Sequence, residues 1–144
     1  MDYSILAAEL LDNMQALRRA KPHRNMGDAM QGEAFVLHYL DNHSGEAMPS
    51  EIGSDMNVSS ARIAQTLNSI EKKGWITRQI DTDDRRRILV RLTPEGKNET
   101  EKLRQTAIGL ATKILRLLDE EDAMEYVRLT GKLSKRILAN NGIF

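Results

Sequence analysis

Six small or polar side chains share one face of a predicted helix that begins near residue 59. They are Ser60, Ala61, Arg62, Ala64, Gln65 and Asn68. Small side chains let a helix approach another surface closely, and the longer ones carry donors and acceptors that match base edges in the major groove of DNA. These six residues, which we call the reading face, therefore predict hydrogen-bonding recognition of double-stranded DNA.

Side chains that can donate hydrogen bonds to phosphate lie near the predicted reading face. These candidate phosphate contacts are Ser59, Lys72, Lys73 and Arg78. Further along, Asp84 precedes three successive cations, Arg85, Arg86 and Arg87, and we expect Asp84 to pair with Arg86 or a neighbouring arginine. Cations at a hairpin tip beside a reading helix suit the minor groove. The alternative is a solvated tip that binds nothing.

The residue types do not favour other kinds of site. The chain has no cysteine, which excludes disulfides and thiolate metal sites. Its three histidines, His23, His38 and His43, do not have the spacing of a metal site, so we expect no metal. The chain also lacks a glycine-rich phosphate loop and an isolated carboxylate pair within an apolar segment. We therefore expect no enzyme activity, no catalytic residue and no cofactor.

The reading face requires a helix whose opposite side is buried. Ser59 is suited to the N-cap, because its hydroxyl can accept a hydrogen bond from a backbone N–H of the first turn. Ile63, Leu67 and Ile70 follow at spacings of four and three, which is the pattern of one buried helical stripe. Gly74 is expected to end this helix.

Two strands are predicted directly after Gly74, over residues 75–80 and 87–92. Apolar residues recur there with period two, at Ile76, Ile80, Ile88, Val90 and Leu92. This alternation is typical of half-buried strands, so the two segments should pair as an antiparallel wing. Thr93 and Pro94 then provide an N-cap and a first helical residue, so a long helix should begin there.

The N-terminal third is predicted to be helical. Residues 2–20 form an amphipathic helix that ends at Lys21-Pro22, and residues 21–32, with one proline and two glycines, form a connection. A second helix should span residues 33–43. A third should begin at Pro49 and, with the reading helix, make a helix-turn-helix pair.

The last third is predicted to form two helices, from Pro94 to about Leu118 and from Asp119 onward. Apolar residues of the first helix repeat at spacings of four and three, and we call them the seam: Leu103, Ala107, Leu110, Ile114 and Leu117. Such a repeat is typical of helices that pack side by side. An intramolecular hairpin is one alternative, but one chain cannot cover all of its apolar stripes. We therefore expect a homodimer.

These elements predict three parts. Residues 1–30 are a dimerisation helix and connection, residues 31–96 are a winged helix-turn-helix domain, and residues 97–144 are a helical dimerisation region. The fold class is mainly α, with a small two- to three-stranded antiparallel wing.

Three motifs lie in register in this chain. They are Glu71-Lys72-Lys73-Gly74, then Asp81, Asp84 and Arg86, then Leu92-Thr93 with Gly96. Together they resemble the MarR family of bacterial transcriptional regulators, whose pattern is E-K-x-G, a D-x-x-D-x-R wing and L-T-x-x-G. The resemblance covers nearly the whole chain and implies a dimeric repressor on a pseudo-palindromic operator. Arg62, Ala64 and Gln65 depart from the family pattern, so the operator sequence does not carry over.

The resemblance also implies a small aromatic or amphipathic anion that binds between the dimer helices and the winged domain. Candidate pocket residues are Met14, Arg18, Met26, Met30, Phe35 and His38. They offer apolar walls and a cation for a carboxylate. The alternative is that these side chains simply pack against their neighbours.

The charge distribution agrees with a nucleic-acid partner. The 21 basic and 21 acidic side chains cancel, but residues 58–91 hold eight basic and four acidic ones. No apolar run approaches the ~20 residues of a membrane span, so we expect no membrane partner and a cytoplasmic location. The alternative function is a winged-helix protein–protein adaptor without DNA binding, which has no need to keep Gln65 and Asn68 free.

Overall fold

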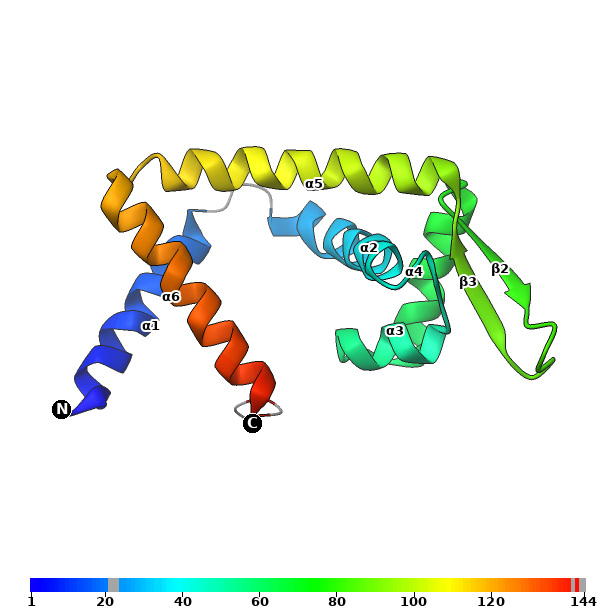
Figure 1. The fold of residues 1–144 in the computed structure, drawn as a ribbon, viewed down its shortest axis with the longest axis horizontal. Helices are drawn as coiled ribbons and strands as arrows, with labels where there is room; N and C mark the ends of the chain where they lie inside the picture. Colours follow the sequence, from blue (N-terminus) through cyan, green and yellow to red (C-terminus); the bar gives the residue numbers. More distant parts are fainter. Residues whose placement is uncertain (21–23, 141, 143–144) are drawn as a thin grey trace. The chain divides into compact units, whose positions relative to one another are not determined.

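The computed structural model describes residues 1–20, 24–140 and 142, and for residues 24–31 it describes the backbone alone. The described elements are α1 (Tyr3–Arg19), α2 (Arg24–Asn42), β1 (Glu46–Ala47), α3 (Pro49–Met56), α4 (Ser60–Lys72), β2 (Ile76–Ile80), β3 (Ile88–Leu92), α5 (Pro94–Leu115) and α6 (Glu120–Ala139) (Figure 1). The chain divides into two compact units, Met1–Thr100 and Glu101–Phe144. The predicted fold class, mainly helical with a small antiparallel sheet, is confirmed. The three-part division at residues 30 and 96 stays a prediction.

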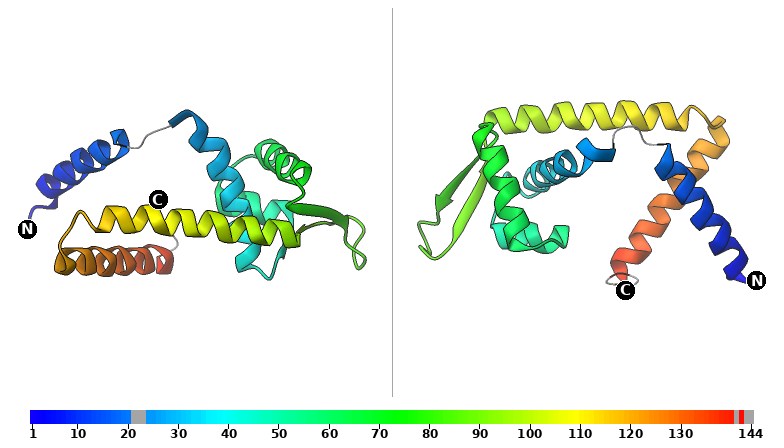
Figure 2. Two further views of the ribbon diagram at one scale, coloured as in Figure 1. Left: turned by 90° about the horizontal axis from the view of Figure 1, so that it is seen from above. Right: turned by 180° about the vertical axis from the view of Figure 1, so that it is seen from behind.

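The sheet has three antiparallel strands in the order β1-β3-β2. Strands β2 and β3 form the predicted hairpin, in which Ile76 pairs with Leu92 and Ile80 pairs with Ile88 (Figures 1 and 2). The short strand β1 adds to the other edge of β3. The sequence left open whether the wing had a third strand, because a strand of two residues has no periodicity to detect.

The core of the first unit lies where α2, α3, α4 and the sheet meet. Its fully or almost fully buried apolar residues are Val36, Leu37, Leu40, Ala47, Ile52, Ile63, Leu67, Ile70, Ile76 and Val90. The predicted stripe of α4 is therefore confirmed as buried. Gly53 of α3 allows this packing, because a Cβ there would lie 3.2 Å from the Cγ1 atom of Ile63.

The predicted ends of α4 are confirmed. The Ser59 hydroxyl accepts a hydrogen bond from the Arg62 backbone N–H at 3.2 Å and so caps the first turn. At the other end Gly74 has a φ of +79°, the left-handed conformation that glycine adopts at lowest cost after a helix. The chain then turns directly into β2.

Two predicted boundaries differ from the structure. Helix α2 begins at Arg24 rather than Glu33, so the glycines at 27 and 32 lie inside a helix instead of in a loose connection. Each glycine costs a helix only about 1 kcal/mol, which the buried residues later in α2 can offset. Helix α5 ends at Leu115, three residues before the expected end. The predicted stop at Lys21-Pro22 lies outside the described residues.

The outer half of the hairpin is less covered than its alternating pattern predicts. Ile76 and Val90 are buried, whereas Ile80 is 65% exposed and Ile88 is 49% exposed. These two isoleucines face each other near the tip. The period-two pattern predicted one buried face along each strand, and this holds for the inner residues but not for Ile80, because strand alternation does not show how far a neighbouring helix reaches.

Helices α1, α5 and α6 keep apolar side chains exposed in the single chain. In α1 the predicted stripe of Leu6, Leu10, Met14 and Leu17 is about half exposed or more. In the seam Leu110 of α5 is 61% exposed, and Leu117, which lies just beyond the end of α5, is 85% exposed. Exposed apolar rows of this length are typical of surfaces that a partner covers. No helix in the described part of the chain is long and apolar enough to cross a membrane.

A close backbone approach joins the reading helix to the start of α5. The Thr93 hydroxyl donates to the Gly74 carbonyl oxygen at 2.6 Å and accepts from the Gly96 N–H at 3.0 Å. Gly96 is buried against Trp75, and a Cβ at this position would lie 1.9 Å from the Trp75 carbonyl oxygen. Only glycine fits here without a shift of the backbone.

We expect Gly96→Ala to lower the free energy of unfolding by about 3 kcal/mol, because an added methyl group overpacks this junction. Gly109→Ala is the matched control in the same helix, since a Cβ at Gly109 meets nothing within 4 Å. The control should gain up to about 1 kcal/mol from helix propensity. Urea unfolding of both variants measures the difference. Equal stability of Gly96→Ala and the wild type would contradict the close approach.

Candidate nucleic-acid interface

The reading face lies on the side of α4 opposite the core. All six residues are exposed, while Ile63, Leu67 and Ile70 of the same helix are buried. The sequence prediction that these two stripes separate is confirmed. Their role in contacting bases stays a prediction.

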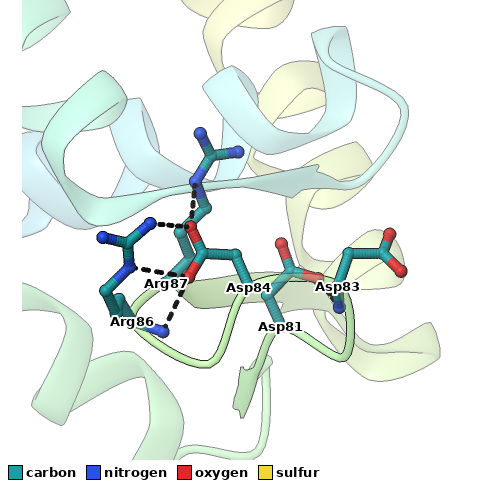
Figure 3. A network of polar contacts seen from close by, with 5 residues as sticks. All are labelled: Asp81, Asp83, Asp84, Arg86 and Arg87. Carbon is teal, nitrogen blue, oxygen red and sulfur yellow. Dashed lines mark hydrogen bonds and ion pairs between the residues drawn. The ribbon is translucent and has the colours of Figure 1, made fainter.

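The loop between β2 and β3 is organised by Asp84 (Figure 3). Its Oδ1 accepts hydrogen bonds from the Arg86 backbone N–H and from Arg86 Nε, both at 3.1 Å, and its Oδ2 accepts from Arg86 Nη2 at 3.3 Å. Arg87 Nε lies 3.7 Å from Oδ2. The expected pairing of Asp84 with Arg86 is confirmed.

These contacts hold the loop while leaving its cations accessible. The hydrogen bonds from Arg86 lower the pKa of Asp84 below its ordinary value. Arg86 itself is 90% exposed. At the start of the loop Asp81 Oδ1 accepts from the Asp83 N–H at 3.0 Å, which forms a local turn (Figure 3). The loop is therefore shaped by its own acidic residues.

Two predicted phosphate contacts have protein partners. Lys73 Nζ donates to Glu33 Oε2 at 2.7 Å and lies 4.9 Å from the centre of the Trp75 ring. Arg78 donates to both carboxylate oxygens of Glu71, from Nε at 2.9 Å and from Nη2 at 3.1 Å. Ser59 is occupied as the cap, and Lys72 is exposed near the end of α4.

Glu33 joins α2 to the reading helix. Its second oxygen accepts a hydrogen bond from the Ser69 hydroxyl at 2.6 Å, so one carboxylate binds both Ser69 and Lys73. Burial raises the pKa of Glu33, but the hydrogen bonds from Lys73 and Ser69 and the charge of Lys73 outweigh it and leave the pKa below its ordinary value. Glu33 was not predicted from the sequence, because its partners lie 36 and 40 residues away.

The predicted effector residues that the structure describes do not share a cavity identified in it. Met14, Arg18 and His38 are exposed, Phe35 is 38% exposed, and the side chains of Met26 and Met30 lie outside the described ones. In the described part of the chain, one cavity of about 460 Å³ lies beside the Thr93 turn and another of about 460 Å³ lies between α3, α4 and the β2–β3 hairpin. None of the six residues lines either of these cavities. The effector pocket stays a prediction.

Metal binding has no structural support among the described residues, where no cluster of three potential ligands occurs. His43 stacks on Tyr39, with ring centres 3.9 Å apart, and its Nδ1 lies 2.7 Å from the Tyr39 carbonyl oxygen. His38 is exposed, and His23 lies outside the described residues.

Comparison with known proteins gives the class to which this geometry corresponds. The family described as winged helix DNA-binding domain matches residues 33–106. The chain therefore belongs to the winged helix DNA-binding domain family. Its motifs resemble those of the MarR regulators.

Particular relatives support this assignment. The transcriptional repressor MdtR of Bacillus subtilis is 29% identical over 90% of this chain and 86% of its own length. The crystal structure of YusO from Bacillus subtilis is 28% identical, with a TM-score of 0.70 over 94% of this chain and 99% of that chain. Apo MarR from Escherichia coli is 22% identical and shares the fold, with a TM-score of 0.64 over 70% of this chain and 74% of that chain.

We expect Glu33→Gln to lower the free energy of unfolding by about 1 kcal/mol at neutral pH, because it weakens a charged hydrogen bond whose lysine is 44% exposed. The folded-state pKa of Glu33 is lowered, so this contribution is present above its unfolded pKa and disappears as the pH falls through the folded value. Urea unfolding of both proteins at neutral and acidic pH measures this. The difference between their free energies of unfolding should be smaller at acidic pH.

Glu46→Gln is the control for Glu33→Gln. It removes an exposed ion pair with Arg91 on the sheet, which should change stability by less than about 0.5 kcal/mol. A difference between Glu33→Gln and wild type that is equally large at both pH values would show that the charge of Glu33 is not responsible.

Proposed function

We propose that this chain is a transcriptional repressor that binds a pseudo-palindromic operator in double-stranded DNA as a homodimer. The observation that carries the proposal is the division of α4 into a buried apolar stripe and an exposed reading face. A helix held on one side and polar on the other is the element that winged helix-turn-helix proteins insert into the major groove. The relative MdtR is itself named a transcriptional repressor.

In the proposed complex, two copies of α4 enter successive major grooves about 10 base pairs apart. Gln65 and Asn68 then face base edges, while Ser59 at the start of the helix and Lys72 at its end lie beside phosphates. The positive end of the helix dipole at Ser59 favours a phosphate there. A protein–protein adaptor would not require these polar groups to remain accessible, so we do not favour that alternative.

The wing is proposed to contact the adjacent minor groove. Arg85, Arg86 and Arg87 occupy its tip, and Asp84 limits the directions that Arg86 can take. A cation already held in one orientation loses less conformational entropy when it binds a phosphate or a narrow groove. This supports a role for the wing beyond that of a solvated tip.

Dimerisation is proposed to involve α1, α5 and α6. These helices expose apolar rows in the single chain, and burial of such rows is favourable at roughly 25 cal/mol per Å². A dimer would also place two reading helices on one duplex.

Release of DNA by a small aromatic or amphipathic anion remains our prediction from the family resemblance. A hundredfold loss of operator affinity would require about 2.7 kcal/mol of coupling between the two ligands. Calorimetric titration with benzoate tests for this ligand.

The proposed function is tested by selecting bound duplexes from a random DNA pool. We expect a two-fold symmetric consensus for the wild type, and Gln65→Ala should relax the preference at one symmetric position by about 1–3 kcal/mol. Lys72→Ala is the control, because removing a cation that binds phosphate weakens all sequences alike. Selection of no consensus by the wild type would refute sequence-specific binding.

The wing is tested by the salt dependence of binding. We expect Arg86→Ala to reduce the slope of log affinity against log salt concentration by about 0.9 for each phosphate group that the variant no longer binds. Lys135→Ala removes a cation of α6 and should leave the slope unchanged. If both variants bind like the wild type across the salt series, the arginines form a solvated tip.

The seam is tested by placing charges in it. A double variant of Leu110→Lys and Ile114→Lys should be monomeric at micromolar concentration, because each unpaired buried charge costs about 3–5 kcal/mol. Gln105→Lys adds a lysine to an exposed position of α5 outside the seam and should remain dimeric. Light scattering measures both masses. A monomeric wild type would remove the dimer proposal.

A further inference from the structure

Arg78 of β2 contacts the reading face rather than only the solvent. Its Nη2 donates a hydrogen bond to Asn68 Oδ1 at 2.6 Å, so a residue of the wing strand holds a residue of the reading helix. This hydrogen bond fixes one end of the Asn68 amide group. It therefore bears directly on what Asn68 can recognise.

The chemistry of arginine settles which atom of the Asn68 amide faces Arg78. A guanidinium group has five N–H donors and no acceptor, so the atom 2.6 Å from Nη2 must be the carbonyl oxygen. The amide nitrogen then lies on the other side of the group, where it presents two donors. The usual ambiguity between the oxygen and the nitrogen of an asparagine is absent here.

Glu71 holds Arg78 in this position. The carboxylate accepts from Nε and from Nη2, so the plane of the guanidinium is defined by two hydrogen bonds. Arg78 is also 31% exposed, which leaves it less accessible to a phosphate than Arg86 at 90%. The hydrogen bonds that Arg78 donates lower the pKa of Glu71 below its ordinary value.

We propose that Arg78 is a positioning residue that makes Asn68 a hydrogen-bond donor toward DNA, so that this position of the operator is guanine rather than adenine. The proposal rests on the proposed binding of α4 in the major groove. Guanine presents two acceptors there, N7 and O6, whereas adenine presents one acceptor and the N6 donor. An asparagine that can rotate freely pairs with adenine through both its oxygen and its nitrogen.

The competing role for Arg78 is the phosphate contact expected from the sequence. The two roles differ in what they change. A phosphate contact supports all sequences alike and contributes to the salt dependence of binding, whereas a positioning residue changes the preference at one base pair and leaves the salt dependence unaltered.

The experiment compares Arg78→Met with the wild type on duplexes that carry guanine or adenine at the Asn68 position of the selected operator. We expect the wild type to prefer guanine about tenfold, and Arg78→Met to bind both within about twofold, with the salt slope unchanged. Arg91→Met is the matched control, because Arg91 is also a strand arginine paired with a glutamate, Glu46. It should keep the tenfold preference.

A second variant tests the same proposal without altering Arg78. Asn68→Asp keeps an oxygen toward Arg78 and replaces the two donors with an acceptor, so the preference should move from guanine toward cytosine, whose N4 is a donor. Asn68 is exposed, and its replacement should not prevent folding.

Three results would overturn the proposal. An unchanged base preference in Arg78→Met with a reduced salt slope would make Arg78 a phosphate contact. An unchanged preference with an unchanged slope would remove Arg78 from recognition, and a retained guanine preference in Asn68→Asp would remove Asn68. If the wild type binds no duplex, the proposed function itself is refuted. That result differs from the three above, so the two kinds of failure can be told apart.

Discussion

Burial of one stripe of α4 is the constraint on which the other features depend. Because Ile63, Leu67 and Ile70 pack into the core, the helix cannot rotate about its axis without exposing them. The reading face is consequently held outward by the hydrophobic effect rather than by contacts of its own. The Ser59 cap and the left-handed Gly74 set where this helix begins and ends.

Ion pairs then adjust what the packed core has positioned. Of the eight basic side chains in residues 58–91, five form ion pairs, with Glu33, Glu71, Asp84 and Glu46 as their partners. Arg62, Lys72 and Arg85 form no ion pair with an acidic side chain among the described residues. Much of the basic excess thus serves first to connect helix, strand and loop, and such pairs in water contribute orientation more than stability.

Most elements of the fold were predictable because their ends depend on neighbouring residues. Ser59, Gly74 and Thr93-Pro94 act within one turn, and their roles were confirmed. The start of α2 was not predictable, because two glycines are tolerated there only through packing elsewhere in the helix. The pairing of Arg78 with Glu71 and Asn68 was also not predicted, because these partners lie on another element of the fold. Sequence identifies Arg78 as a cation but does not show which group its side chain reaches.

The core of the first unit contains no residue of α1 or α6, and α5 contributes only Gly96 and Thr100 to the buried set. Substitutions along the exposed apolar rows can therefore accumulate without unfolding the winged part. The side chains that hold α4 in place and those of the exposed apolar rows are therefore separate sets, and each set can change without disturbing the other within one short chain.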